Sequence, residues 1–490
     1  MYGKIWDKDI VSKLSQKGHR KGERKMGAKE PSGVELKELD EDEQEQAQLL
    51  RAMLGTLQHY FGNVGQMLAG VNDPRNPVLI DYPLEALLFT GIFMFLCQLG
   101  ARRQIKHKLR ENGSSKAKMK ALLGVDEIPH GDTLNYGFKK LAVAEIQEVV
   151  CRMVEVLIRK KVLSRWRLLN KYYQVAIDGT GMLVFKERHC EHCLTKKLRN
   201  GETLYYHPVL EAKLVTANGF AFSLMTEFIE NSDPEATKQD CELKAFYRLS
   251  ERLKRRFPRL PICLLMDGLF AGGPTFERCQ KYGWKYFIVL TDDDLASVQQ
   301  EFEAQFQLVP QNHKEIEFGP QKVVKQSYRW ANEISYTDSE KKEHQISVLE
   351  CVEEKRDNEG NINSTKFKWL TNFEVTIRTV DILANEGARL RWKIENEGFN
   401  SQKNGGFEME HAYSEDETAG KIFYLLMQMA HLIFQLAEKG SLFRKAFPKG
   451  VGSLKNIAFR FLEAWRNLRL SNRDFLSLFG GKYQIRFDSS

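Results

Sequence analysis

Two aspartates end short apolar segments that are typical of buried strands. Asp178 ends the run YYQVAID, Asp267 ends the run ICLLMD, and a glycine follows each. A carboxylate at the end of a buried strand has an uncompensated charge unless it pairs with a cation or binds a metal ion. If both strands lie in one sheet, the two carboxylates come close together, and a divalent cation relieves their repulsion. Alternatively, each aspartate simply forms a turn after its strand.

A third acid lies in the segment RWKIENEGFNSQK, residues 391–403. Arg391 and Glu395 are four residues apart, so they share one face of a helix. Lys403 is eight residues beyond Glu395 and stays near that face if the helix continues past Gly398. This face would offer one carboxylate for a metal ion and two cations for phosphate. The alternative is an exposed salt bridge within the helix.

Other acids compete for the same role. Asp292, Asp293 and Asp294 follow the apolar segment YFIVL, and three acids in a row more often solvate a loop than bind metal. Glu211 lies within the strand-like segment VLEAKLV, and its position does not tell which face of the strand it occupies.

Three motifs together resemble those of DDE-type insertion-sequence transposases, which have an RNase H-like catalytic core. They are AIDGTG at 176–181, LLMDG at 264–268 and RWKIENEGFN at 391–400. One branch of that family has a Y-(2)-R-(3)-E-(6)-K signature, which Arg391 and Glu395 match. Ala388 stands where the tyrosine would be, and Lys403 comes one residue later than the signature requires. The resemblance covers roughly residues 170–440.

The resemblance implies a role for each site residue. Asp178 would bridge two Mg²⁺ ions, while Asp267 and Glu395 would each hold one of them, and Mn²⁺ can substitute for Mg²⁺. Arg391 and Lys403 would grip the phosphate of the DNA backbone. The implied activity is metal-dependent cleavage of DNA strands at the ends of a mobile element, followed by strand transfer to target DNA.

The implied partner is double-stranded DNA, namely the terminal inverted repeats of the element and the target. Cutting of paired ends implies a dimer on DNA, in a prokaryotic cytoplasm and at the nucleoid. Two alternatives stay open: an RNase H-like nuclease that cuts without joining, and a catalytically silent DNA-binding protein.

Two histidines and two cysteines crowd into residues 189–193, HCEHC. Cys-x-x-Cys is a common half of a zinc site, so Zn²⁺ at Cys190 and Cys193 is one interpretation. The four side chains are too close in sequence for one tetrahedron to use them all. His207 is the nearest further ligand, and no second Cys-x-x-Cys occurs. The sequence therefore favours a polar loop that contacts DNA through its lysines and arginines.

The spacing of apolar residues predicts the elements that position these side chains. After Lys171 the order is strand, strand, strand, helix, strand, helix, strand, which indicates a mixed sheet with helices on its faces. We therefore expect an α/β protein with an RNase H-like catalytic domain at 169–440. A β-rich insertion at 300–370 precedes the last catalytic helix, which is expected within 375–397, and another helix follows at 418–438.

The first third of the chain is predicted to be helical and basic. A flexible basic tail is expected at 1–40, an all-helical DNA-binding domain at 41–168, and a basic segment at 441–490. The stretch from Arg102 to Lys120 has eight lysines or arginines and one acid, as a phosphate backbone requires. Its candidate DNA contacts are Arg102, Arg103, Lys106 and Lys108. Solvated helix faces are the alternative.

Composition limits the class of protein. The 490 residues are 42% hydrophobic and 28% charged with a net charge of +8, which excludes a disordered or coiled-coil chain. The longest apolar stretch, Leu84 to Leu99, is short for a membrane span and is expected to be a buried helix. The charged N-terminus is unlike a secretory signal, and eight scattered cysteines indicate a reducing cytosol.

Overall fold

The structure, a computed structural model, describes residues 39–231, 239–319, 324–357 and 359–488. The chain forms two compact units: Met1–Lys161 with Asn400–Ser490, and Val162–Phe399. These boundaries differ from the expected ones, because residues 400–440 cluster with the N-terminal helices instead of the sheet. The expected tail at 1–40 lies almost entirely outside the described residues.

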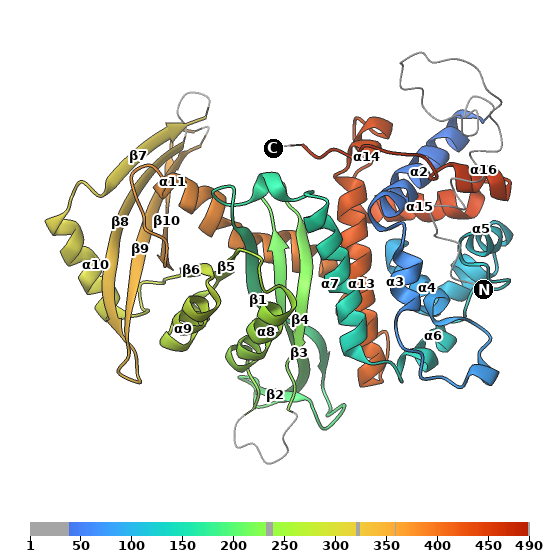
Figure 1. The fold of residues 1–490 in the computed structure, drawn as a ribbon, viewed down its shortest axis with the longest axis horizontal. Helices are drawn as coiled ribbons and strands as arrows, with labels where there is room; N and C mark the ends of the chain where they lie inside the picture. The colour runs from blue at the N-terminus through green and yellow to red at the C-terminus, as the bar shows by residue number, and fades with distance from the viewer. Residues whose placement is uncertain (1–38, 232–238, 320–323, 358, 489–490) are drawn as a thin grey trace. The chain divides into compact units, whose positions relative to one another are not determined.

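The discontinuous unit is built from helices (Figure 1). Its α-helices are α2 (Glu41–Phe61), α3 (Val64–Ala69), α4 (Leu84–Leu96), α5 (Gly113–Leu123), α6 (Gly131–Phe138), α7 (Val143–Arg159), α12 (Ser401–Asn404), α13 (Glu417–Glu438), α14 (Ser441–Ala446), α15 (Leu454–Asn467) and α16 (Asn472–Ser477). A 3₁₀ turn, η2 (Pro77–Leu79), and a π-helical turn, η3 (Lys106–Arg110), complete it.

Two apolar helices form the centre of this helical unit. The stretch expected to be a buried helix is confirmed as α4, in which every residue except Glu85 is buried. The expected helix at 418–438 is confirmed as α13, which is buried along most of its length and packs against α2, α4 and α7. A helix that is apolar on all sides needs other helices around it, which explains why α13 joins the N-terminal helices. Among the described residues, no helix is both long and apolar enough to cross a membrane.

The second unit is built on one sheet (Figure 1). Its strands are β1 (Tyr173–Phe185), β2 (Leu194–Lys197), β3 (Thr203–Val215), β4 (Ala221–Phe228), β5 (Ile262–Met266), β6 (Lys285–Val289), β7 (His313–Phe318), β8 (Val324–Thr337), β9 (Glu343–Arg356) and β10 (Ile362–Thr371). Its helices and turns are η4 (Ser164–Trp166), α8 (Glu242–Arg256), η5 (Gly268–Phe270), α9 (Gly273–Tyr282), α10 (Ala296–Leu308), α11 (Val380–Ile382), η7 (Leu383–Gly387), η8 (Ala388–Trp392) and η9 (Ile394–Asn400).

The sheet is mixed and open. The strands follow the order β2-β3-β1-β5-β6-β10-β9-β8-β7, and β4 pairs with β3. Strands β1, β5 and β6 run parallel, whereas β1, β3 and β4 form an antiparallel meander. The strands β7–β10 form a second meander that joins the same sheet where β10 pairs with β6. The coarse α/β class expected from the sequence is therefore confirmed.

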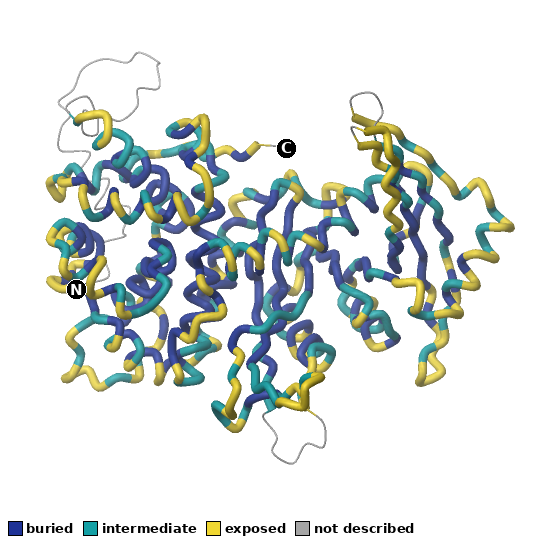
Figure 2. Tube along the Cα trace, turned by 180° about the vertical axis from the view of Figure 1, so that it is seen from behind, coloured by how far each residue is buried: buried dark blue, intermediate teal, exposed yellow. Residues whose placement is uncertain are grey.

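Helices flank this sheet and leave its central strands buried. Helix α8 packs on β3 and β4, α9 on β6, α10 on β8, and η8 on β1 and β5. Figure 2 shows the central strands as buried along most of their length, whereas the outer strand β7 is largely exposed. One apolar cluster joins Ala176 of β1 and the alternate residues Cys263 and Leu265 of β5 to Leu390 of η8 and Ile394 of η9. This cluster anchors η8 and η9 to one face of the sheet.

The segment around Glu395 is helical but irregular. A regular helix was expected within 375–397, but the chain instead forms π-helical turns η7 and η9 separated by the 3₁₀ segment η8. Gly387, at the junction of η7 and η8, has φ −111° and ψ −93°, which interrupts the α-helical hydrogen-bond pattern. A π-helical turn is often found at a functional site.

Candidate active site

Sheet pairing brings Asp178 and Asp267 to adjacent positions. Strands β1 and β5 are parallel, with Ala176 opposite Leu265, and continuing this register by two residues places Asp178 beside Asp267. Ala176 and Leu265 face the apolar cluster under η8 and η9. Since alternate residues of a strand share a face, both aspartates project toward that same side. The register therefore supports the expectation that the two acids are neighbours. The expectation that Asp178 ends its strand is wrong, because β1 continues to Phe185, whereas Asp267 directly follows β5.

Arg391 joins the third acid to the first. Its Nη1 donates to Glu395 Oε1 at 2.9 Å and lies 3.7 Å from Asp178 Oδ2. The Arg391 side chain is only 7% exposed, whereas that of Glu395 is 36% exposed. The pair is thus not the exposed intrahelical salt bridge that spacing alone allowed. It ties η8 and η9 to the middle of β1.

Burial and repulsion alter the titration of both aspartates. Burial raises the pKa of Asp178 to about 7; the charges of Glu395 and Asp267 add to this effect, and Arg391 opposes it. The pKa of Asp267 is also raised by burial, while the backbone N–H of Leu269 and the charge of Arg391 act in the opposite direction. The Arg391 guanidinium alone therefore does not compensate the negative charge of these acids. A bound metal cation would compensate it.

Glu242, in the first turn of α8, is a further acid of this site that the sequence did not reveal. A Cβ added to Gly179 would overlap the Glu242 carboxylate, so that carboxylate lies directly against the middle of β1. Burial raises the pKa of Glu242, and the charge of Asp267 raises it further. Glutamates are common in the first turn of exposed helices, so no local signal distinguishes this one.

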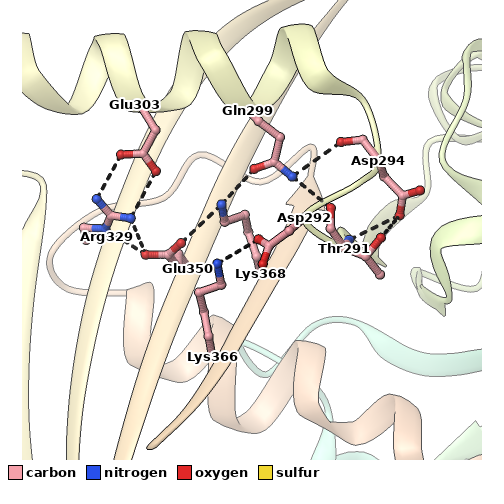
Figure 3. A network of polar contacts seen from close by, with 9 residues as sticks. All are labelled: Thr291, Asp292, Asp294, Gln299, Glu303, Arg329, Glu350, Lys366 and Lys368. Carbon is pink, nitrogen blue, oxygen red and sulfur yellow. Dashed lines mark hydrogen bonds and ion pairs between the residues drawn. The ribbon is translucent and has the colours of Figure 1, made fainter.

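The three acids after β6 have different neighbours. Figure 3 shows Asp292 paired with Lys366 at 2.7 Å, and Asp294 accepting from the hydroxyl of Thr291 at 2.6 Å. Asp292 is therefore engaged away from the aspartate pair. Asp294 lies closer, because a Cβ on Gly268 would be 2.9 Å from its Oδ2, and its charge raises the pKa of Asp267.

A buried ion pair lies on the face of β3 that the site uses. Glu211 is opposite Asp178 in the β1–β3 register, and its carboxylate accepts from Ser223 at 2.7 Å. Lys213 Nζ is 3.4 Å from Glu211 Oε2, and both side chains are 0% exposed. The Lys213 ammonium lies 5.5 Å from the ring centroid of Phe399, at the end of η9. This pair supports the segment that contains Glu395.

The expected DNA contacts lie in the helical unit. Lys403 is on α12 and pairs with Glu410 at 2.8 Å. Arg102 is half-buried and donates to the carbonyl of Gly131, whereas three other cations of the basic run are exposed: Arg103, Lys106 and Lys108. Lys118 of the same run is not available to phosphate, since it is buried and donates to the carbonyls of Trp465 and Leu468.

The HCEHC segment lies between β1 and β2. Cys190 and Cys193 meet His207, which comes from β3. All eight cysteines fall among the described residues, and none forms a disulfide.

The acids around Arg391 are set wider apart than the ligands of one ion. Within the described residues, only groups that include Cys190 bring three ligand atoms within 4.8 Å of one another. The site is thus a loose set of carboxylates around Arg391, formed by β1, β5, α8 and η9. No protein-family model matches the chain, and no curated protein matches it either.

Proposed function

We propose that this protein is a DNA transposase of the DDE type, which cleaves DNA strands at the ends of a mobile element and joins them to target DNA. The observation that supports this proposal most directly is the convergence of Asp178, Asp267 and Glu395. They come from the middle of β1, the end of β5 and a helical segment far apart in sequence, and Arg391 connects two of them.

The topology of the sheet agrees with the RNase H-like core that the motifs imply. An antiparallel meander, β1-β3-β4, is followed by two parallel strands, β5 and β6, with helix α8 before β5 and helix α9 between β5 and β6. The strands β7–β10 lie between β6 and the segment of Glu395. They occupy the place where an insertion before the last catalytic element is expected.

The carboxylates suit Mg²⁺. They are hard oxygen donors on separate elements, and burial together with mutual repulsion raises the pKa of Asp178 and Asp267. Asp178, Asp267 and Glu395 would hold the ions, with Glu242 and Asp294 beside them. Mg²⁺, when bound, would activate a hydroxyl nucleophile and stabilise the leaving oxygen. The wide spacing of the acids favours two ions over one.

The protein's own residues supply positioning and charge. Arg391 holds the Glu395 carboxylate toward β1, so the third acid stays oriented. The exposed cations Arg103, Lys106 and Lys108 lie in η3 and the turn before it, and a cluster of this kind suits a phosphate backbone. Cutting of two paired element ends would require two copies of the chain on the DNA.

The test uses purified full-length protein and duplex DNA that contains the inverted repeats flanking its gene. We expect nicking at the repeat end only with Mg²⁺ or Mn²⁺. Asp178→Asn, Asp267→Asn and Glu395→Gln should each reduce nicking by at least about 10³-fold while DNA binding persists. Asp292→Asn is the matched control, because Asp292 pairs with Lys366, and it should cut normally.

The same reaction separates the alternatives. Inclusion of a target plasmid should give a joined product from the cleaved 3′ end. Cleavage with no joined product would instead indicate a nuclease, and a footprint without cleavage would indicate a silent DNA-binding protein. Nicking that survives all three acid substitutions would exclude this site as the catalytic centre.

A further inference from the structure

Antiparallel pairing brings two cysteines and a histidine together away from the acids. The β1–β3 ladder pairs Leu183 with His207, and the β2–β3 ladder begins with Leu194 opposite Tyr206. Cys193 immediately precedes β2, so it meets His207 from the neighbouring strand. Cys193 is 0% exposed and His207 is 6% exposed. Cys190 and His207 are 17 positions apart in the chain, and together with Cys193 they meet in a site that is mostly buried.

The distances between their ligand atoms are those of a tetrahedral zinc site. The two Sγ atoms are 3.7 Å apart, and His207 Nε2 lies 3.4 Å from Cys190 Sγ and 3.2 Å from Cys193 Sγ. Tetrahedral zinc separates two thiolate sulfurs by about 3.8 Å, and a sulfur from a nitrogen by about 3.6 Å. A disulfide would need about 2.05 Å between the sulfurs. The arrangement matches that of metal ligands, and the two sulfurs are too far apart to form a disulfide bond.

We propose that Cys190, Cys193 and His207 bind a structural Zn²⁺ ion, with His192 as the fourth ligand. A ring nitrogen of His192 lies within 4.8 Å of Cys190 Sγ, but not of all three ligand atoms, so the His192 ring would turn toward the ion to complete the tetrahedron. The other nearby ring, His189, stacks on Phe185 with centroids 4.3 Å apart and planes 10° apart. Its packing role makes it the matched control for His192.

The ligand types at this site select a different metal ion from the one expected at the acid site. Thiolate and imidazole ligands suit zinc, whereas Mg²⁺ prefers hard oxygen ligands. Hydrogen bonds to the backbone of the HCEHC loop hold it in position to bind the metal ion. Asn231 donates through its side chain to the carbonyl of Cys193 at 3.1 Å and through its N–H to the carbonyl of His192 at 3.2 Å.

The ion would fix the loop after β1 onto β3. Strand β1 also contains Asp178, and β3 pairs with it along this length. Zinc binding would therefore stabilise the meander on which the acid site is built. This role is independent of whether the protein cleaves DNA.

The first experiment measures metal content. Full-length protein is loaded with Zn²⁺, dialysed against a weak chelator and analysed by elemental mass spectrometry. We expect one zinc per chain in the wild type and in Cys241→Ser, since Cys241 is an exposed cysteine elsewhere. Cys190→Ser/Cys193→Ser and His207→Gln should each retain less than about a tenth of that amount. A wild type without zinc, or a double variant that keeps it, would overturn the site.

A second experiment tests the fourth ligand. Zinc affinity is measured by competition with a chelating dye in His192→Ala and in His189→Ala. We expect the first to weaken binding on the order of a hundredfold and the second by less than about threefold. The reverse order would overturn the assignment of His192.

A third measurement uses only the wild type, so it does not depend on variants that fold. Removal of zinc with a strong chelator should lower Tm, and Zn²⁺ but not Mg²⁺ should restore it. Chelation should also expose Cys190 to alkylation, while Cys241 reacts equally in both states. Equal Tm and equal alkylation of Cys190 with and without zinc would contradict the proposal.

Discussion

At the scale of single residues, Arg391 and Lys403 differ in what surrounds them. Arg391 is buried and contacts Glu395 and Asp178, whereas Lys403 pairs with Glu410, whose side chain is 61% exposed. We expect Arg391→Ala to slow single-turnover cleavage of pre-bound DNA by roughly ten- to hundredfold, because a charge-assisted contact is lost. Lys403→Ala should have a smaller effect. A larger loss for Lys403→Ala would mean that the lysine of the family signature acts despite its shifted position.

Gly179 and Glu242 form a second residue-scale pair. A Cβ at position 179 overlaps the Glu242 carboxylate, so Gly179→Ala should destabilise the protein by about 1–3 kcal/mol. Glu242→Ala makes room for the methyl group. The double variant should therefore be no less stable than Glu242→Ala alone, which gives a coupling energy of about 1–3 kcal/mol. Urea unfolding of the four proteins measures this coupling, and simple additivity would show that the two positions do not touch.

The presence of the two strands could be predicted from the sequence, but the full extent of β1 and the strand pairing could not. Runs such as YYQVAID and ICLLMD indicate buried strands by composition, and Asp267 directly follows β5 as expected. Strand β1 does not end at Asp178 but continues to Phe185, because its second half pairs with β3. Asp178 and Asp267 lie close together because β1 pairs with β5, about ninety residues later in the chain. No local sequence pattern specifies this pairing. Glu242 escaped detection for the same reason, since its contact with Gly179 is long-range.

At the scale of elements, the helical segments after β10 also differ from the expected form. The four-residue spacing of Arg391 and Glu395 correctly predicted their contact. It did not predict the π-helical and 3₁₀ turns, because these depend on how η8 and η9 pack onto β1 and β5.

The β3 strand depends on its buried ion pair. Lys213→Met would remove the ammonium that lies 3.4 Å from Glu211 Oε2 in a site that is 0% exposed. We expect a loss of about 3–5 kcal/mol in the free energy of unfolding, measured by urea denaturation. Lys393→Met is the control, because the Lys393–Glu397 pair is 28% exposed on each side and should contribute less than about 1 kcal/mol. If the two variants lose equal stability, the buried pair does not support β3.

At the scale of the whole molecule, the division into units sets which fragments fold. Residues 162–399 form one continuous unit, so this fragment alone should unfold in a single cooperative transition. A fragment of residues 1–161 lacks α13, against which α2, α4 and α7 pack, and should be poorly folded. Joining it to 400–490 through a long flexible linker should restore cooperative melting by circular dichroism. Equal melting of 1–161 with and without 400–490 would contradict this division.

The same discontinuity affects synthesis on the ribosome. The helices before residue 161 emerge first, but α13 is complete only at residue 438, about 280 residues later. At bacterial and eukaryotic elongation rates this interval lasts roughly 14–55 s. During that time the apolar surfaces of α4 and α7 that later contact α13 have no covering, while residues 162–399 can fold completely. The nascent chain therefore presents a long-lived hydrophobic surface, and its yield in cells should depend on chaperones that bind early chain segments.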